Sequence, residues 1–577
     1  MVEIFICFKI TLFILILLGY SYFFKDKFNI KLEFSFPLAI VVIIDAIYIF
    51  SLINLMMVGS IIIYILGIVL LIFYICKLKK EFFIKIFQFN ILFPLLLLAF
   101  FSILIRNLHM LHFDNFSHWA VIVKQLISLN SLPNASNILT SYFEYPPGSA
   151  YFIYFFCFFT NNSESFQIIA QLILSIILSI PLLGILKKKN IINYIFWTCY
   201  VIFTLVIDIS VADLLVDSLV GIVAVMCYCF FYQYKNNLRK CLWLFVPLNL
   251  FLLLVKNIAI FFYIINVICL FYLIFKNRKI FSKKDILINI GIVILPLLLF
   301  MFWKLRCKLV FGEMISCQSI SLVNYKDNFS LKTIDDIKSI VIVFLKNLFS
   351  INNLATILVL LLLIVVTIFI IKSKKYKDIK LSLYILILFF SYNFFLLFSY
   401  IFSMTLDEAL RLASYSRYIF TVVIFLVGIV IINGEYLLKK NAIYKIIILG
   451  ILLIFVINSE KNLKNLFGYQ EYSNSIRYEL DGYFKDYQNV DFKNYNIIVI
   501  SNEASKDMMI SNLINYYLGY RGYLFIKDSS LLDEYNIKDY DYIITLDNND
   551  DVSKFMKDCN CYDNKKGIYY NINRNNN

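Results

Sequence analysis

The sequence has few charged residues, few glycines and few prolines for its length. Only 16% of its 577 residues are charged, whereas soluble domains carry about 25%. That shortage, together with a hydrophobic content of 61%, excludes a water-soluble enzyme and a disordered chain. With 16 glycines and 8 prolines, a collagen-like repeat is excluded too. The remaining class is a protein that places most of its side chains in a membrane.

Long apolar runs recur over the first four fifths of the chain. A helix needs about 20 apolar residues to cross a bilayer, and we count fourteen such candidate spans between Ile4 and Ile457. The predicted fold class is therefore mainly α, a polytopic transmembrane helical bundle. Gly148 to Thr160 is apolar but only 13 residues long, so we predict an interfacial or re-entrant helix there. The ends of each predicted span carry an error of about 2 to 4 residues.

The net charge of +15 belongs to this apolar part. From Lys461 onward there are 14 Lys and Arg against 17 Asp and Glu, a net of −3, which leaves +18 for residues 1–460. No basic face interleaved with aromatic residues is present, so we expect no nucleic-acid partner. The positive-inside rule instead assigns the lysine-bearing connections to the cytoplasm: Lys77–Lys80, Lys187–Lys189, Lys235–Lys240, Lys276–Lys284, Lys372–Lys377 and Lys439–Lys440.

Because spans alternate in direction, placing the lysine-bearing connections in the cytoplasm places the loop 106–149 and the C-terminal region outside it. We therefore predict a multi-pass protein of the cell membrane, in contact with the lipid bilayer. Residues 1–460 form the predicted transmembrane domain. Residues 461–577 change character, because short β-rich runs at 495–501, 522–526, 541–546 and 567–572 alternate with polar helical stretches. We predict a small α/β domain, and the lack of a Gly-rich phosphate loop favours an accessory role over a nucleotide site.

Polar chemistry is concentrated in the loop 106–149. It contains every histidine of the sequence, namely His109, His112 and His118. Asp114 stands at the start of an amphipathic stretch, 116–127, which we expect to form a helix at the membrane surface with Trp119 at headgroup level. Asp114 is a helix N-cap, a catalytic carboxylate, or both. The histidines are metal ligands or simply interfacial polar residues, since their spacing alone does not show that they converge.

The same loop ends in Glu144-Tyr145-Pro146-Pro147-Gly148, a rigid bend that leads into the short apolar helix. Many spans, a long outer loop with an early Asp, a Pro-Pro turn before a short helix and a soluble C-terminal domain together resemble the GT-C superfamily of membrane glycosyltransferases. The resemblance covers residues 106–186 by motif and the rest by architecture. It implies a polyprenyl-phosphate-linked sugar as donor, a cell-envelope glycan or lipid as acceptor, and Asp114 as the catalytic residue. The chain departs from the family in having three or four spans before the loop and Asp114-Asn115 where an acidic pair is frequent.

Sugar transfer needs a base for the acceptor hydroxyl and cations for the leaving phosphate. Asp114 is the predicted base, with Glu144 and His118 as partners that orient it or hold a divalent cation with it. Tyr145 is predicted to contact substrate. The candidate phosphate ligands are Lys256, Arg411 and Arg417, for which snorkelling or pairing with Asp407 and Glu408 is the alternative. A further acidic group, Asp208, Asp213 and Asp217, is expected in the same compartment.

Two other functions remain open at this point. An O-antigen-type polymerase or ligase shares multiple spans and outer-loop arginines, but it rarely carries a soluble α/β domain. A transporter of lipid-linked oligosaccharides would have polar residues spread through the spans at mid-depth. Mid-span charge is rare here, Asp45 being the main case. The sequence therefore favours chemistry at the membrane surface over passage through the membrane.

Overall fold

The computed structural model describes residues 2–86, 88–186, 190–277, 282–372, 374, 376–437, 442–488, 490–505, 507–559 and 565–571. The chain divides into two compact units. The first comprises residues 1–108, 126–132 and 144–469, and the second comprises 109–125, 133–143 and 470–577. The second unit therefore contains two segments of the loop 106–149 in addition to the C-terminal region.

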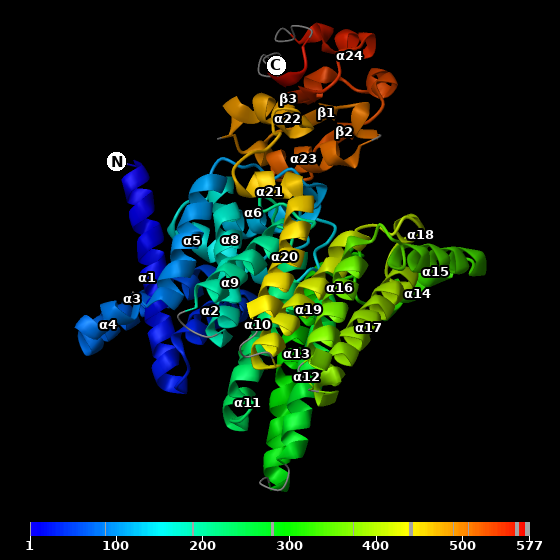
Figure 1. The fold of residues 1–577 in the computed structure, drawn as a ribbon. Coiled ribbons are helices and arrows are strands. Elements are labelled where there is room, and N and C mark those ends of the chain that lie inside the picture. The colour runs from blue at the N-terminus through cyan, green and yellow to red at the C-terminus, as the bar shows by residue number, and fades with distance from the viewer. Residues whose placement is uncertain are drawn as a thin grey trace. The chain divides into compact units, whose positions relative to one another are not determined.

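The first unit is a bundle of long helices (Figure 1). Among the described residues, eleven helices are long and apolar enough to cross a membrane. They are α1 (Val2–Phe28), α2 (Leu32–Leu52), α3 (Met56–Leu78), α8 (Glu164–Ile185), α10 (Asp217–Tyr234), α11 (Leu238–Val255), α12 (Ile260–Lys276), α13 (Lys283–Phe311), α16 (Leu354–Lys372), α17 (Lys380–Phe402) and α19 (Tyr415–Leu437).

The remaining three predicted spans form shorter helices. Helices α5 (Phe89–Ile105) and α9 (Ile191–Val206) have 17 and 16 residues. Helix α20 (Ala442–Asn458) is followed by α21 (Glu460–Leu466) at an angle of 90°. The number of candidate spans is thus eleven, or twelve if this bent pair counts as one, against the fourteen predicted. Helix α7 (Gly148–Phe159) has 12 residues and is short, as predicted.

Close backbone contacts hold the bundle together at small residues. A Cβ atom added to Gly221 of α10 would lie 2.8 Å from the carbonyl oxygen of Thr421 on α19. Gly428 of α19 in turn contacts Val225 of α10. Small residues let two helices approach closely, which is how helices pack where lipid supplies no hydrophobic driving force between them. Helices α10 and α19 are accordingly buried along most of their length.

The polar connections of the first unit form two groups. At one end, hydrogen bonds and an ion pair link three lysine-bearing connections: Lys77 to Asp26 at 2.6 Å, Lys31 to Gln233 at 3.1 Å and Lys240 to the carbonyl of Asn29 at 2.8 Å. Lys187–Lys189 and Lys439–Lys440 lie outside the described residues. The other group joins the end of α9 and the following turn to α19 and α21, through Ser416 to Asp208 at 2.5 Å, Asn462 to Val206 at 2.9 Å and Asn465 to Ser210 at 2.9 Å.

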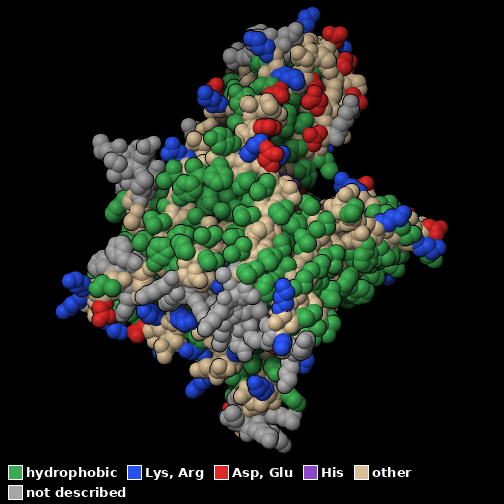
Figure 2. Space-filling model, viewed as in Figure 1, with side chains coloured by type: hydrophobic (Ala, Val, Ile, Leu, Met, Phe, Trp, Pro, Cys, Tyr) green, Lys and Arg blue, Asp and Glu red, His purple; other side chains and the backbone are tan. Residues whose placement is uncertain are grey.

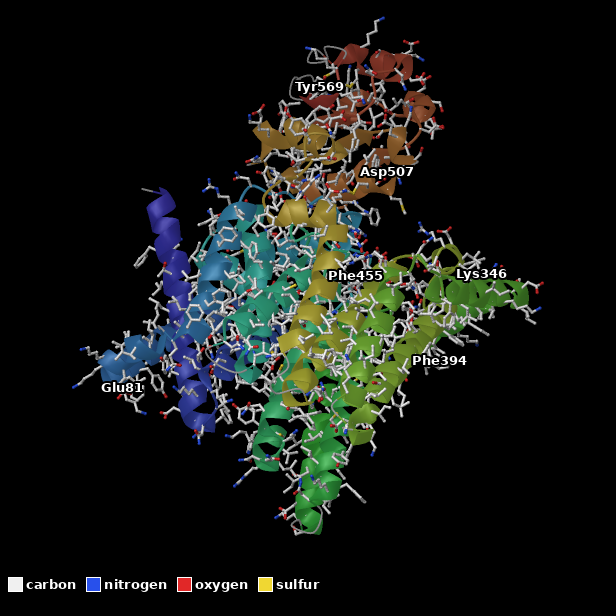
Figure 3. The ribbon with its side chains drawn as sticks, in the orientation of Figure 1. Glu81, Lys346, Phe394, Phe455, Asp507 and Tyr569 are labelled. Atoms are coloured by element: carbon white, nitrogen blue, oxygen red, sulfur yellow. The ribbon has the colours of Figure 1, made fainter. Side chains whose placement is uncertain are left out.

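Helices α4 (Lys80–Ile86), α14 (Leu322–Ser330), α15 (Ile334–Leu348) and α18 (Leu406–Leu410) complete the first unit. Figure 2 shows large apolar areas over this bundle, with lysines and arginines in patches near its ends. Phe394 on α17 is 71% exposed and lies on the outer surface of that helix (Figure 3). An apolar surface of this extent on long helices is what a lipid bilayer covers. The first unit is therefore a multi-pass membrane bundle.

The second unit is built on a four-stranded sheet, and its strands fall inside the four runs that the sequence predicts. They are β1 (Ile497–Ile500), β2 (Leu524–Ile526), β3 (Tyr542–Thr545) and β4 (Gly567–Tyr570), in the order β2-β1-β3-β4. Strand β1 is parallel to β2 and β3, whereas β4 is antiparallel to β3. Strands β1 and β3 are buried at every residue, as expected for the centre of a sheet. Helices α22 (Ile476–Phe484), α23 (Met508–Leu518) and α24 (Asp550–Phe555) surround the sheet (Figure 1).

Candidate functional site

Asp114 lies at the start of a helical segment of the second unit. A π-helical turn, η1 (Asn115–Trp119), leads into α6 (Ala120–Leu129), and turns of this kind are frequent at functional sites. Asp114 occupies the N-cap position of η1, yet its side chain makes no capping hydrogen bond. The backbone N–H of Asp114 itself donates a hydrogen bond to Nδ1 of His112 at 3.1 Å. The carboxylate, 18% exposed, is 4.0 Å from the same Nδ1.

The three histidines have separate surroundings. The ring of His109 stacks on Tyr472 with a centroid distance of 3.9 Å. His118 is buried, with Nδ1 2.7 Å from the hydroxyl of Ser117 and its ring 4.5 Å from that of Tyr142. Within the described part of the chain, no group of three or more His, Cys, Asp or Glu side chains is arranged to hold a metal ion.

The amphipathic helix is buried in protein, and the prediction that it lies at the membrane surface is wrong. Phe116 is 1% exposed, Trp119 4% and Val123 1%. The ring of Phe116 packs edge-on against Tyr516 of α23, at 5.2 Å between centroids. The apolar spacing predicted the helix correctly, but it could not distinguish a lipid surface from a protein surface, since both bury the same face.

Arg477 of α22 connects the Asp114 segment to the C-terminal part of the second unit. Its guanidinium group donates a hydrogen bond to the carbonyl of Met110 at 2.7 Å and lies 5.0 Å from the ring centroid of Phe116. The same group is 3.3 Å from the carboxylate of Asp481. Gln470 adds two hydrogen bonds, one from the N–H and one to the carbonyl of His109, at 2.8 and 2.7 Å. The contacts with Met110, Phe116 and His109 join residues more than 360 positions apart, and no sequence pattern indicated them.

Lys124 of α6 is a second residue that sequence reasoning missed. Its ammonium group donates to the carbonyl of Tyr516 and lies 4.4 Å from the ring centroid of the same residue. Burial lowers the pKa of Lys124 to about 8, and the positive charges of Arg477 and Lys493 act in the same direction. A lysine with a pKa near neutrality can exchange protons at physiological pH. Its signal in the sequence, a lysine on the polar side of an amphipathic helix, is too common to single it out.

Glu144 and Tyr145 belong to the first unit, where both are held by polar contacts. The carboxylate of Glu144 accepts from Lys304 at 3.0 Å and from Ser319 at 2.7 Å. The hydroxyl of Tyr145 donates to Gln318 at 2.6 Å. These residues precede α7, whose first residue, Gly148, lies so close to α11 that an added Cβ would be 2.5 Å from the carbonyl oxygen of Leu254. The Pro-Pro-Gly bend thus fits against α11 because its last residue lacks a side chain.

A buried charge cluster lies where α10 begins and α11 ends. Asp217, fully buried, accepts a hydrogen bond from Lys256 at 2.6 Å and lies 3.8 Å from the guanidinium group of Arg417. The ammonium group of Lys256 is also 4.7 Å from the ring centroid of Tyr418. The structure therefore brings together two of the three predicted phosphate ligands. The third, Arg411, is exposed and pairs with Asp407 at 3.1 Å, which is the alternative interpretation that the sequence left open.

A cavity of about 880 Å³ opens in the first unit beside this cluster. Asp208, Ser414 and Ser416 line it, and Ser414 accepts a hydrogen bond from Arg417. Asp208 has a φ of +64° and Ser414 a φ of +60°, both in the left-handed region that non-glycine residues rarely adopt. Such strain is common at functional sites. Asp213 lies in a separate small cavity of about 30 Å³, with Gln171 and Ser218.

No family model, curated protein or solved structure matches this chain. The resemblance to the GT-C superfamily consequently depends on the sequence motif at 106–186 and on the architecture. The structure assigns the predicted site residues to both units: Asp114 and His118 to the second, and Glu144, Tyr145, Lys256, Arg411 and Arg417 to the first. Each group must be assessed by its own surroundings.

Proposed function

We propose that the chain is an integral membrane glycosyltransferase that moves a sugar from a polyprenyl-phosphate carrier to a cell-envelope glycan or lipid on the extracytoplasmic face of the cell membrane. One observation carries the proposal. In the first unit, the buried charge cluster at Asp217 adjoins a large cavity, and both lie among the connections that do not carry the lysine clusters. Ionisable groups buried in a membrane bundle are functional by default, because burying them is costly.

Asp114 supplies the base of the proposed reaction. Its carboxylate takes the proton of the acceptor hydroxyl while the acceptor oxygen forms a bond to the anomeric carbon of the sugar. The bond between that carbon and the carrier's phosphate oxygen breaks, and the phosphate leaves with the electron pair, so the configuration at the carbon inverts. Support comes from the side chain of Asp114, which makes no helix-capping hydrogen bond and keeps partial exposure of 18%. A carboxylate used as a cap would be a poorer proton acceptor.

Lys256 and Arg417 are the proposed contacts for the leaving phosphate. Arg417 offers a planar fork that suits phosphate oxygens, and Lys256 adds a compact positive charge. Their contacts with Asp217 hold both side chains in fixed positions before substrate binds, which lowers the cost of ordering them. Glu144 is proposed to orient neighbouring groups through its contacts with Lys304 and Ser319. Tyr145, whose hydroxyl is held by Gln318, is proposed as a substrate contact.

The test uses cells that lack the chain, complemented with the wild type, Asp114→Asn or Asp486→Asn. Asp486 is an exposed aspartate of the same unit, so its substitution is a matched control. Mass spectrometry of envelope glycans and of polyprenyl-linked sugars should show one missing sugar, and accumulated donor, in the null and Asp114→Asn cells. The control should restore the sugar. An unchanged envelope in the null cells would refute the function, whereas full restoration by Asp114→Asn would refute only the assignment of the base.

A further inference from the structure

The 880 Å³ cavity of the first unit has a lining suited to sugar hydroxyl groups. Amide side chains enter it from three elements: Asn347 of α15, Asn352 of the following connection and Asn458 of α20. Hydroxyl groups of Ser414 and Ser416 line it as well. Its volume lies within the range of about 300 to 1,000 Å³ that is usual for small-molecule sites.

Some side chains of the cavity lining are fixed by hydrogen bonds within the protein, and others can form hydrogen bonds with a ligand. Asp208 accepts a hydrogen bond from Ser416, and the amide of Asn353 bonds the carbonyl of Asn347 and the hydroxyl of Tyr415, at 3.1 and 3.4 Å. In contrast, within the described ranges the side-chain amides of Asn352 and Asn458 form no hydrogen bond, and both residues are exposed. An amide carries both donors and an acceptor, so it can pair with hydroxyl groups of either orientation.

The cavity lining also includes apolar surface, which a carbohydrate site needs in addition to polar groups. Tyr415 and Phe420 of α19 contribute rings, and Leu354 and Ala355 contribute aliphatic surface at the start of α16. A sugar ring carries C–H groups on its faces and hydroxyl groups around its edge, so it needs apolar surface and polar groups together. Specific ligand sites combine these two kinds of lining in the same way.

The charge of the lining is unsuited to a phosphate. Among the described residues that line the cavity, there is no arginine and one lysine, Lys461, beside the carboxylates of Asp208 and Glu460. Glu460 is itself paired with Lys464 at 2.6 Å. The charges balance once Lys464 is counted, and without it the lining is net negative, whereas phosphate sites present an excess of donors with positive charge. The ligand that fits is uncharged.

We propose that this cavity binds the acceptor as a neutral oligosaccharide, and that the amides of Asn352 and Asn458 recognise its hydroxyl groups. The inference rests on the proposed glycosyltransferase function and names the class of its acceptor. It also separates the roles of neighbouring parts of the first unit, because the donor phosphate would contact Lys256 and Arg417 and not the amide lining.

The experiment compares the full chain in lipid nanodiscs with the double variant Asn352→Ala/Asn458→Ala and the control Asn236→Ala. Asn236 is an exposed asparagine within the lysine-bearing connection 235–240. The first probe is the neutral oligosaccharide pool released from the envelope by mild acid and freed of charged glycans by ion exchange. The second probe is undecaprenyl phosphate. Frontal affinity chromatography with mass spectrometry gives Kd for each retained component.

The wild type and the control should retain members of the neutral pool, and the double variant should bind them at least about tenfold more weakly, since two hydrogen bonds are lost. Kd for undecaprenyl phosphate should stay unchanged. The inference is overturned if no oligosaccharide is retained, if the double variant binds as well as the wild type, or if it loses undecaprenyl phosphate instead. Equal melting temperatures of the variants establish that folding is unaffected.

The two proposals fail in different ways. If the null cells lack a sugar but the protein retains no neutral oligosaccharide, only the assignment of the cavity is wrong. If the protein retains oligosaccharides but the envelope of the null cells is unchanged, the cavity binds glycan without the proposed transfer, and the proposed function fails.

Discussion

Replacing Arg477 with Met should release the Asp114 segment from the second unit while leaving its sheet intact. The side chain is 4% exposed and makes three different contacts, with the Met110 carbonyl, the Phe116 ring and the Asp481 carboxylate. Methionine keeps most of the aliphatic length, so the cavity that it leaves is small. What disappears is the charge and the hydrogen-bond donors.

The size of the effect follows from these contacts. A hydrogen bond from a charged group contributes about 1.5 to 3 kcal/mol, and a cation over an aromatic ring contributes about 0.5 to 2 kcal/mol. The carboxylate of Asp481 keeps its hydrogen bonds from Tyr472 and Tyr517, so the loss on that side is small. The segment 110–119 should therefore open more easily by about 2 to 5 kcal/mol, which raises the equilibrium constant of local opening about 30-fold to 4,000-fold.

Hydrogen–deuterium exchange of the full chain in nanodiscs measures this opening directly. Peptides covering 110–119 should exchange faster by that factor in Arg477→Met, and peptides covering β1 and β3 should not change. Arg521→Met is the control, because Arg521 is an exposed arginine of the same unit. Two results would refute the reasoning: a change below about threefold in 110–119, or an equal acceleration throughout the sheet, which would indicate global destabilisation.

Two further predictions concern Lys124 and Gly148. The pKa of Lys124 is lowered to about 8, so between pH 8 and its usual value of 10.5 the unfolded chain binds more protons, and stability rises with pH. In thermal unfolding experiments, the free energy of unfolding should rise by about 2 kcal/mol between pH 7.5 and 9.5. The variant Lys124→Met should lose this pH dependence, whereas the variant Lys557→Met should keep it. Gly148→Ala should cost about 1 to 3 kcal/mol because of its contact with the Leu254 carbonyl. Gly450→Ala, which meets no atom within 4 Å, should be neutral or stabilising, and equal melting temperatures for the two variants would contradict this account.

The sequence predicts the fold correctly where a short run of residues is enough to determine the secondary structure. Strands β1 to β4 fall inside the four β-rich runs, since each run is short and bounded by polar residues. The number of spans could not be predicted, because the ends of helices depend on turn geometry. Helix α9 begins where the side chain of Asn190 caps Ile192 and ends just before Asp208 adopts a positive φ. Neither feature changes the hydropathy of the run from which the span was predicted.

The candidate site could be predicted only as a set of residue types. The sequence indicates Lys256 and Arg417 as cations near span ends, but it groups Asp217 with Asp208 and Asp213 only by their expected compartment. In the structure, Asp217 contacts both cations. Lys256 and Asp217 are 39 positions apart, and their contact depends on how α10 and α11 pack. Arg411 has the same charge and a similar position in the sequence, yet it is exposed. Tertiary packing therefore decides which cation is buried, and hydropathy patterns carry no information about it.

The second unit contains two segments of the loop 106–149 in addition to the C-terminal region, which gives that region a definite structural role. The sequence predicted a small α/β domain at residues 461–577 with an accessory role. In the structure, residues 109–125 and 133–143 fold with 470–577. His109 stacks on Tyr472, Phe116 contacts Tyr516 and Arg477, and Lys124 contacts Tyr516. Without residues 470–577, the apolar side of the Asp114 helix and the buried ammonium group of Lys124 would lose these partners. The C-terminal region thus supports the segment that carries the proposed base, and this role requires no nucleotide site of its own.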